Sequence, residues 1–300
     1  MSRLVCLGMV VKDMVFHVPQ IPPVPQKLTA HSVRTGFGGM AATAAAAAAA
    51  LGGEVEFWGR VGDDDAGQEA LRAFVARGVD PQVRVLPATQ SPMAAVMVDD
   101  SGERMLAAYM GQLDPAADWL PLERLDRVQA VHADFRWVEG ARALYQAARP
   151  RGLPRVLDAD AGNVQSLQTL VPLADHIIFS ERGLAAYAPG MAVEEALRAV
   201  APGTDAVVGV TLGERGSLFV HRDSLHAFAS PRITPMDTNG AGDVFHAAYA
   251  LALARSMPWK DAVHYASATA ALKCTRSHGW GPLPTHEEVM HFMKGAACKA

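Results

Sequence analysis

The feature that most constrains the fold is an alternation along the chain between short apolar runs and segments with helical periodicity. Continuous apolar runs of this length are typical of strands that are buried on both faces. When such strands alternate with amphipathic helices, the helices cover both sides of a mostly parallel sheet. The predicted strands span residues 3–11, 54–59, 128–133, 155–158, 176–179, 206–211 and 217–220, and the predicted helices span residues 40–51, 66–77, 139–149, 181–187, 193–200 and 244–256.

Two segments do not follow this alternation. Residues 15–36 are rich in proline and extended in character, and residues 92–110 read as two strands joined by the turn sequence DDSG. We expect them to build a small β-sheet outside the main layer, acting as a lid that excludes water from a reaction at the sheet edge. An edge hairpin with a long loop is the alternative. The prediction is one domain, with an α/β core at 1–11, 37–90 and 112–300 and a β lid at 12–36 and 91–111.

Composition excludes several classes of protein. With 300 residues, 50% of them hydrophobic, the chain can bury a substantial core, and a net charge of −4 argues against a nucleic-acid-binding face. No apolar run approaches the roughly 18 residues of a membrane span. The first residues lack the cleavage site of a signal peptide, and the three cysteines show no metal-binding spacing. We therefore expect a reduced, cytoplasmic protein.

The residues with the clearest chemistry lie at 235–245, which read PMDTNGAGDVF. Helical sequence follows from Val244, so Gly240, Ala241 and Gly242 are expected at a helix N-terminus with Asp243 at or beside the cap. Unpaired N–H groups and the helix dipole favour an anion there. An acid beside an anion site suits phosphoryl transfer to an alcohol, because the carboxylate takes the hydroxyl proton while the amides stabilise the phosphoryl oxygens. A simple capping turn is the alternative.

Other nucleotide and metal motifs are missing. The sequence contains no G-x-x-x-x-G-K-[ST] and no G-x-G-x-x-G after its first strand. It also contains no H-E-x-x-H zinc pattern. P-loop enzymes and dinucleotide-dependent oxidoreductases are therefore disfavoured.

The segment DTNGAGDVF resembles the C-terminal signature of the ribokinase (PfkB) family of carbohydrate kinases. The resemblance extends to GFGGMAATAAAAAAALGG at 36–53, GRVGDDDAG at 59–67 and VTLGERGSL at 210–218. It implies a ribokinase-like three-layer α/β/α fold with a mostly parallel, Rossmann-like sheet and a small β-sheet lid. It also implies an ATP-dependent kinase that uses Mg²⁺.

The same resemblance implies roles for individual residues. Asp243 would be the catalytic base, and Gly240, Ala241 and Gly242 would form the anion hole. The sugar-binding positions would be Asp13, Gly38, Gly39 and Thr43, the last standing where many members have Asn; the nucleotide-binding positions would be Thr211, Gly213 and Gly216; and the metal-binding positions would be Glu181 for magnesium and Asp237 for a monovalent cation such as K⁺. The family's N-x-x-E element departs most, because Ser180 and Gly183 replace its Asn and Glu.

Several strings, among them ADFRW at 133–137 and AALKCTR at 270–276, look like the 6-deoxy-6-sulfofructose kinases. That resemblance gives Lys27 and Arg136 as candidates for binding the sulfonate. Ala108 stands where that branch has a polar amide, which leaves fructose, another ketose or a different acidic sugar open.

Alternative functions are a fructokinase, a ribokinase, another carbohydrate or nucleoside kinase, and a catalytically silent sugar-binding regulator. The expected partners are a small sugar and ATP, with no nucleic acid and no membrane. Exposed lid strands favour a homodimer through the lid.

Overall fold

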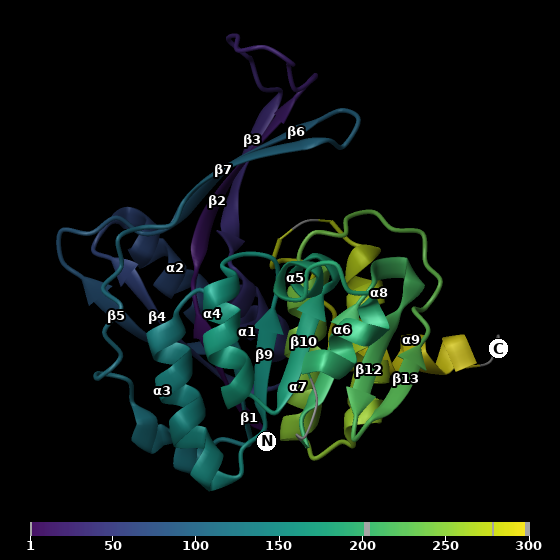
Figure 1. Cartoon of the computed structure of the whole chain (residues 1–300). Helices are drawn as coiled ribbons and strands as arrows, with labels where there is room; N and C mark the ends of the chain where they lie inside the picture. The colour runs from purple at the N-terminus through teal and green to yellow at the C-terminus, as the bar shows by residue number, and fades with distance from the viewer. Residues whose placement is uncertain (1, 201–204, 278, 298–300) are drawn as a thin grey trace.

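The main body of the protein is a large twisted sheet between two layers of helices, and a small second sheet projects from it (Figure 1). The structure is a computed structural model that describes residues 2–200, 205–277 and 279–297. In this part of the chain the large sheet has nine strands in the order β13-β12-β11-β10-β9-β8-β1-β4-β5. The strands β11, β10, β9, β8, β1, β4 and β5 pair in parallel with their neighbours. Strands β12 and β13 are added antiparallel at the β11 edge. The expected three-layer α/β/α fold is confirmed.

Each predicted element overlaps an observed one, and their ends agree to within three residues. The strands are β1 (Arg3–Gly8), β4 (Glu54–Gly62), β5 (Val79–Leu86), β8 (Ala130–Asp134), β9 (Arg155–Ala159), β10 (His176–Ser180), β11 (Val207–Thr211), β12 (Ser217–His221) and β13 (Ser224–Phe228). The helices are α1 (Met40–Ala50), α2 (Asp65–Val75), α3 (Val138–Ala148), α4 (Val164–Leu170), α5 (Glu181–Tyr187), α6 (Val193–Val200), α7 (Ala241–Ala254), α8 (Trp259–Cys274) and α9 (His286–Ala297).

The two faces of the sheet bury separate hydrophobic cores. Helices α1, α2, α7, α8 and α9 contribute to one core, and α3 to α6 contribute to the other. Helix α1 is almost entirely alanine and is buried from Met40 to Ala48, because it packs between the sheet and α7. Alanine side chains let these layers approach closely at no cost in side-chain entropy. Among the described residues, no helix combines the length and hydrophobicity needed to cross a membrane.

The sequence-based assignment missed several elements for identifiable reasons. Strand β5 contains Pro81, which argues against a strand in general but is tolerated here because β5 lies at the edge of the sheet. Helix α8 is buried over much of its circumference, so its sequence lacks a clear amphipathic period. Strand β13 and the helices α4 and α9 were also not predicted.

The small sheet, which we call the lid, has the order β3-β2-β6-β7 within the described residues. Its strands are β2 (Val11–Val18), β3 (Ser32–Gly38), β6 (Met93–Asp99) and β7 (Arg104–Tyr109). Residues 15–36 and 92–110 therefore do form a sheet of their own, as expected. The proline-rich segment 19–31 forms the loop at the far end of the lid (Figure 1).

The chain passes from the body into the lid immediately after β1, earlier than the predicted strand end at residue 11. A Cβ at Gly8 would lie 2.2 Å from Asp134 Oδ2, and the N–H of Met9 donates to the same oxygen at 3.3 Å. The return from the lid ends at Gly39, whose φ of 97° is accessible mainly to glycine. A Cβ at Gly39 would lie 2.3 Å from the carbonyl oxygen of Met9. The two crossings between body and lid, at Gly8–Met9 and at Gly39, are thus packed directly against each other.

Replacing Gly39 with alanine should destabilise the protein more than the same change at Gly152. Gly152 also has a positive φ, of 65°, but nothing lies within 4 Å of its Cβ position. Gly152→Ala should therefore lower the free energy of unfolding only by the left-handed backbone cost of about 1–2 kcal/mol. Gly39→Ala adds a backbone clash, so its loss should exceed the control by roughly 1–3 kcal/mol. Urea unfolding followed by tryptophan fluorescence measures both, and equal losses would contradict the packing of the two crossings.

Candidate active site

Two cavities meet at the N-terminus of α7, at the carboxyl ends of the sheet strands. One has a volume of about 750 Å³ and is formed by residues from the C-terminal third of the chain, between 211 and 274. The other has a volume of about 310 Å³ and lies between the lid and the body. Ala241 and Gly242 line the larger cavity, whereas Gly240 and Asp243 line the smaller one. A single helical turn thus faces both cavities.

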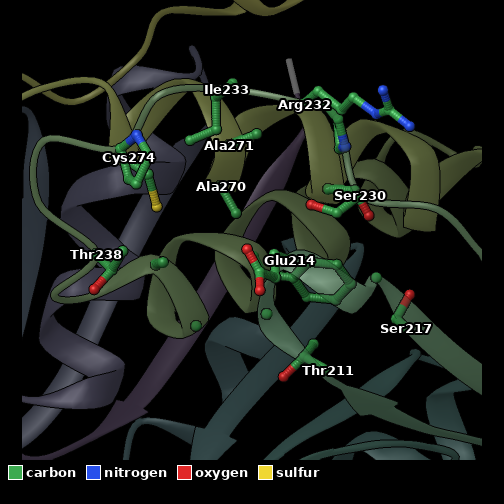
Figure 2. Close-up of a pocket in the computed structure, with 18 residues that line it drawn as sticks. Thr211, Glu214, Ser217, Ser230, Arg232, Ile233, Thr238, Ala270, Ala271 and Cys274 are labelled. Carbon is green, nitrogen blue, oxygen red and sulfur yellow. The ribbon is translucent and has the colours of Figure 1, made fainter.

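The larger cavity has an apolar wall and a polar wall (Figure 2). Ile233, Ala270, Ala271 and Cys274 form the apolar side, and Thr211, Glu214 and Ser217 lie across from them. An apolar slot next to a helix N-terminus accommodates a flat ring and the anionic group attached to it. The predicted nucleotide positions Thr211, Gly213 and Gly216 all line this cavity.

The first turn of α7 presents backbone donors at the point where the cavities meet. Gly240 is the N-cap residue in the left-handed region with φ 72°, and the helix begins at Ala241 rather than at the predicted Val244. Asp243 therefore lies inside the first turn and is not the capping residue. The N–H of Ala241 donates to the carbonyl of Thr238 at 3.2 Å. The N–H groups of Gly242 and Asp243 are left as donors in the described structure, because a first turn has no partners for them within the helix.

The smaller cavity gathers most of the predicted sugar-binding positions. Asp13, Gly38, Gly39 and Thr43 line it together with Asp243. The Thr43 hydroxyl accepts a hydrogen bond of 3.2 Å from Trp280 Nε1, which fixes its orientation. Two lid strands, β2 and β3, and the N-terminus of α1 therefore bring separate segments of the sequence to Asp243.

Two carboxyl groups that line the smaller cavity, those of Asp243 and Asp13, have raised pKa values. Burial raises the pKa of Asp243 to about 8, with a further increase from the nearby Asp158 and a decrease from His246. Burial raises the pKa of Asp13 to about 6. A carboxyl group with a pKa near neutrality is suited to accept a proton and release it again.

The loop that leads into α7 is held by two basic side chains. Lys273 of α8 is only 3% exposed, and its ammonium group donates to the backbone carbonyls of Asp237, at 3.1 Å, and of Asn239. Arg104 of β7 forms an ion pair of 3.0 Å with Asp237 Oδ1, so this contact joins the lid to the body. The N–H of Asn239 also donates to Asp237 Oδ1 at 2.9 Å.

Three predicted site residues line neither cavity. Lys27 is exposed in the loop at the far end of the lid, and Arg136 is exposed with its guanidinium 5.2 Å from the ring of Phe135. Glu181, the expected magnesium ligand, forms an ion pair with Arg215. Asp237, expected at a monovalent-cation site, does line the smaller cavity, with Arg104 as a cationic partner.

Several residues that line the cavities were not found from the sequence. The small cavity also includes His17, Arg34, Arg104, Lys273 and Trp280, and the large one includes Glu214, Arg232 and Phe245. The alternation along β2 could have placed His17 and Val15 on the same face as Asp13. Arg104 and Lys273 lack such a signal, because they reach the site only through tertiary packing.

Comparison with known proteins identifies the family. Residues 1–286 match the family described as "pfkB family carbohydrate kinase". The chain belongs to this family. The carbohydrate kinase is 25% identical to the ribokinase of Haemophilus influenzae, over 98% of this chain and 99% of the relative. It is 28% identical to the fructokinase of Vibrio alginolyticus, over 85% of this chain and 91% of the relative.

Solved structures agree with this assignment. A putative ribokinase from Agrobacterium tumefaciens superposes with a TM-score of 0.93 at 31% identity, covering 100% of the kinase and 99% of that chain. The ribokinase of Arabidopsis thaliana, solved with ribose and ATP, superposes with a TM-score of 0.86 at 24% identity, covering 98% of both chains. The fold is shared across the whole length, and the kinase is an ATP-dependent carbohydrate kinase, as the sequence predicted.

Asp243→Asn should stabilise the folded kinase, and the gain should grow as the pH rises. A carboxyl group whose folded pKa is raised contributes stability below its unfolded pKa of about 4, and this contribution is lost as the pH rises through the folded value of about 8. Asparagine does not ionise, so the variant does not lose this stability as the pH rises. Its Tm should exceed that of the wild type more at pH 8 than at pH 5, measured by differential scanning calorimetry. A difference that is constant with pH would show that Asp243 ionises normally.

Proposed function

We propose that the kinase transfers the γ-phosphoryl group of ATP to a primary hydroxyl of a ketose-type sugar, with Asp243 as the base. One observation carries this proposal: Asp243 faces the smaller cavity, while Gly242, on the same turn of α7, faces the larger one. A hydroxyl in the small cavity and a phosphate in the large one would therefore meet at one point. Such an in-line arrangement supplies much of the acceleration of phosphoryl transfer.

The residues of the first turn divide the chemistry between them. The carboxylate of Asp243 accepts the hydroxyl proton as the new O–P bond forms. The N–H groups of Gly242 and Asp243, together with the helix dipole, stabilise the negative charge on the transferred phosphoryl oxygens. The adenine ring of ATP fits against the apolar wall at Ala270 and Ala271. Asp13 accepts hydrogen bonds from sugar hydroxyls in its ionised form.

Magnesium belongs to the proposal as a neutraliser of the nucleotide phosphates. The described residues contain no group of three His, Cys, Asp or Glu side chains that could hold a metal ion. We expect Mg²⁺ to be held mainly by phosphate oxygens and water, which is its usual arrangement on a nucleotide. Glu181 could contribute only after leaving Arg215. At Asp237, Arg104 already provides the positive charge that K⁺ would supply.

The acceptor we propose carries an anionic group at the end away from the phosphorylated hydroxyl, as 6-deoxy-6-sulfofructose does. Three long basic side chains line the small cavity, and two of them have internal partners, Arg104 at Asp237 and Lys273 at the loop carbonyls. Arg34 of β3 is exposed, and no ion pair involves it in the described part of the chain. Its guanidinium can bind a sulfonate, carboxylate or phosphate with two hydrogen bonds.

The lid also supports the proposed homodimer. Val33 and Met105 on the lid are 54% and 44% exposed, and β3 and β7 are edge strands of the small sheet. Exposed apolar side chains on unpaired edges favour association with a second copy. A cytoplasmic location, with its supply of ATP, completes the proposal.

Asp243→Asn should lower kcat by about 10²- to 10⁴-fold, because the amide cannot accept the hydroxyl proton. Binding of ATP should be retained, since Asp243 does not line the larger cavity. The measurement is ADP release with 6-deoxy-6-sulfofructose, fructose, fructose 6-phosphate and ribose as acceptors. A fully active Asn variant would overturn the role of Asp243. If no sugar stimulates ADP release by the wild type, the regulator alternative is favoured.

Arg34→Gln should raise the KM for an anionic acceptor by roughly 10- to 100-fold, as expected for the loss of a charged hydrogen bond of about 1.5–3 kcal/mol. The KM for a neutral sugar should change by less than about twofold if no charge is bound. Lys27→Gln and Arg136→Gln are matched controls, because both residues lie outside the cavity. A larger effect at Lys27 than at Arg34 would show that the lid loop, rather than β3, reaches the acceptor.

A further inference from the structure

A cluster of buried polar side chains lies directly beneath the first turn of α7. It consists of His246 of α7, Asp158 of β9, and His132 and Asp134 of β8, each at most 3% exposed. None of them lines either cavity, so the proposed reaction does not use them directly. Buried groups of this kind are costly unless they are paired, which makes their arrangement informative.

His246 contacts backbone acceptors with both of its ring nitrogens. Nδ1 lies 2.8 Å from the carbonyl oxygen of Gly242, and Nε2 lies 3.1 Å from the carbonyl oxygen of Ile178. Carbonyl oxygens can only accept hydrogen bonds, and a neutral imidazole has one N–H. A neutral ring would place a nitrogen lone pair against one of these oxygens. Only the imidazolium satisfies both contacts.

Asp158 supplies the negative charge that a buried imidazolium requires. Its Oδ2 lies 3.4 Å from His246 Nδ1, and both side chains are 3% exposed. No hydrogen bond reaches this oxygen from the described residues, so His246 is its nearest compensating group. Burial alone would favour the neutral form of each group, raising the pKa of Asp158 and lowering that of His246. The two carbonyl contacts of the ring oppose this effect for His246.

The other titratable groups around the pair do not replace it. Burial lowers the pKa of His132 to about 3, so this ring is neutral, and its centroid lies 6.1 Å from that of His246. Asp134 accepts backbone N–H groups from Met9, Ala41 and Arg136, and so is engaged elsewhere. Burial keeps the thiol of Cys6 on β1 protonated by raising its pKa. The remaining charged neighbours of His246 are Asp160, after β9, and Asp243 itself. The exposed Arg136 also lowers the pKa of Asp158, so it favours the ionised form of that carboxyl group together with His246.

We propose that His246, as an imidazolium paired with Asp158, is a positioning residue that fixes the first turn of α7 against the sheet and stabilises the ionised form of Asp243. The contact with Gly242 orients the turn that carries the phosphoryl-binding amides, and the contact with Ile178 ties that turn to β10. The positive charge of His246 lowers the pKa of Asp243, opposing the increase caused by burial and by Asp158. The inference rests on the proposed role of Asp243 as the base.

The test is the pH dependence of kcat/KM in His246→Asn and in the double variant Asp158→Asn/His246→Asn. Asparagine keeps one donor near Gly242 but removes the charge, leaving Asp158 as an uncompensated anion. The apparent pKa of the acidic limb should therefore rise by about one unit, which lowers kcat/KM about tenfold at pH values below that pKa. In the double variant the pair is again neutral, and the limb should return toward the wild-type position. His291→Asn, on the exposed face of α9, is the matched control and should leave the limb in place.

A limb that stays in place in His246→Asn, or one that does not return in the double variant, would overturn the ion pair. Nitrogen NMR of ¹⁵N-histidine-labelled wild-type kinase provides a second readout that needs no variant. One histidine should keep both ring protons above pH 8, where exposed rings have lost one. If every histidine is neutral at that pH, the proposal fails. An active Asp243→Asn variant would instead overturn the proposed base and leave this protonation result standing.

Discussion

The site depends on one constraint, the placement of the N-terminus of α7 between two cavities. The N–H groups in the first turn of a helix have no partners within that helix, and here two of them lie at the junction of the cavities. The left-handed Gly240 turns the chain sharply enough to place Asp243 beside them. Lys273 and Arg104 hold the preceding loop, and the alanine-rich α1 packs against α7. Most of the geometry of the site therefore depends on the placement of one helical turn.

Much of the fold was predictable because the relevant signals are local. The buried strands of a parallel sheet appear as apolar runs, and helices such as α3 and α6 show a clear amphipathic period. Elements whose neighbours override the local signal were missed: β5 carries a proline that only an edge position tolerates, and α8 is buried on too many sides to show a period. The start of α7 was placed three residues late, because a Gly-Ala-Gly sequence does not resemble a helix until its capping geometry is known.

The residues around Asp243 were largely predictable from the sequence, whereas the basic side chains that line the smaller cavity were not. The predicted residues of segment 237–243, Asp13 and the Gly38–Gly39 pair follow from the family resemblance, and the structure gathers them around Asp243. The charged residues chosen for acceptor binding, Lys27 and Arg136, are exposed outside the cavity, whereas Arg34, Arg104 and Lys273 line it. A basic residue in a sequence carries no information on which way its side chain points. Only the pairing register of the lid strands places Arg34 beside Val15 and so within the cavity.

The two cavities draw on different parts of the chain. The larger one is built entirely by residues between 211 and 274, all in the body, whereas the smaller one needs the lid strands β2, β3, β6 and β7 as well. In the proposed function, ATP therefore contacts no lid residue, while acceptor affinity includes the free energy of holding the lid in place. On this proposal, substitutions in the lid strands would change the contacts with the acceptor and leave the lining of the larger cavity unchanged. A modular division of this kind allows one nucleotide-binding half to serve many different sugars.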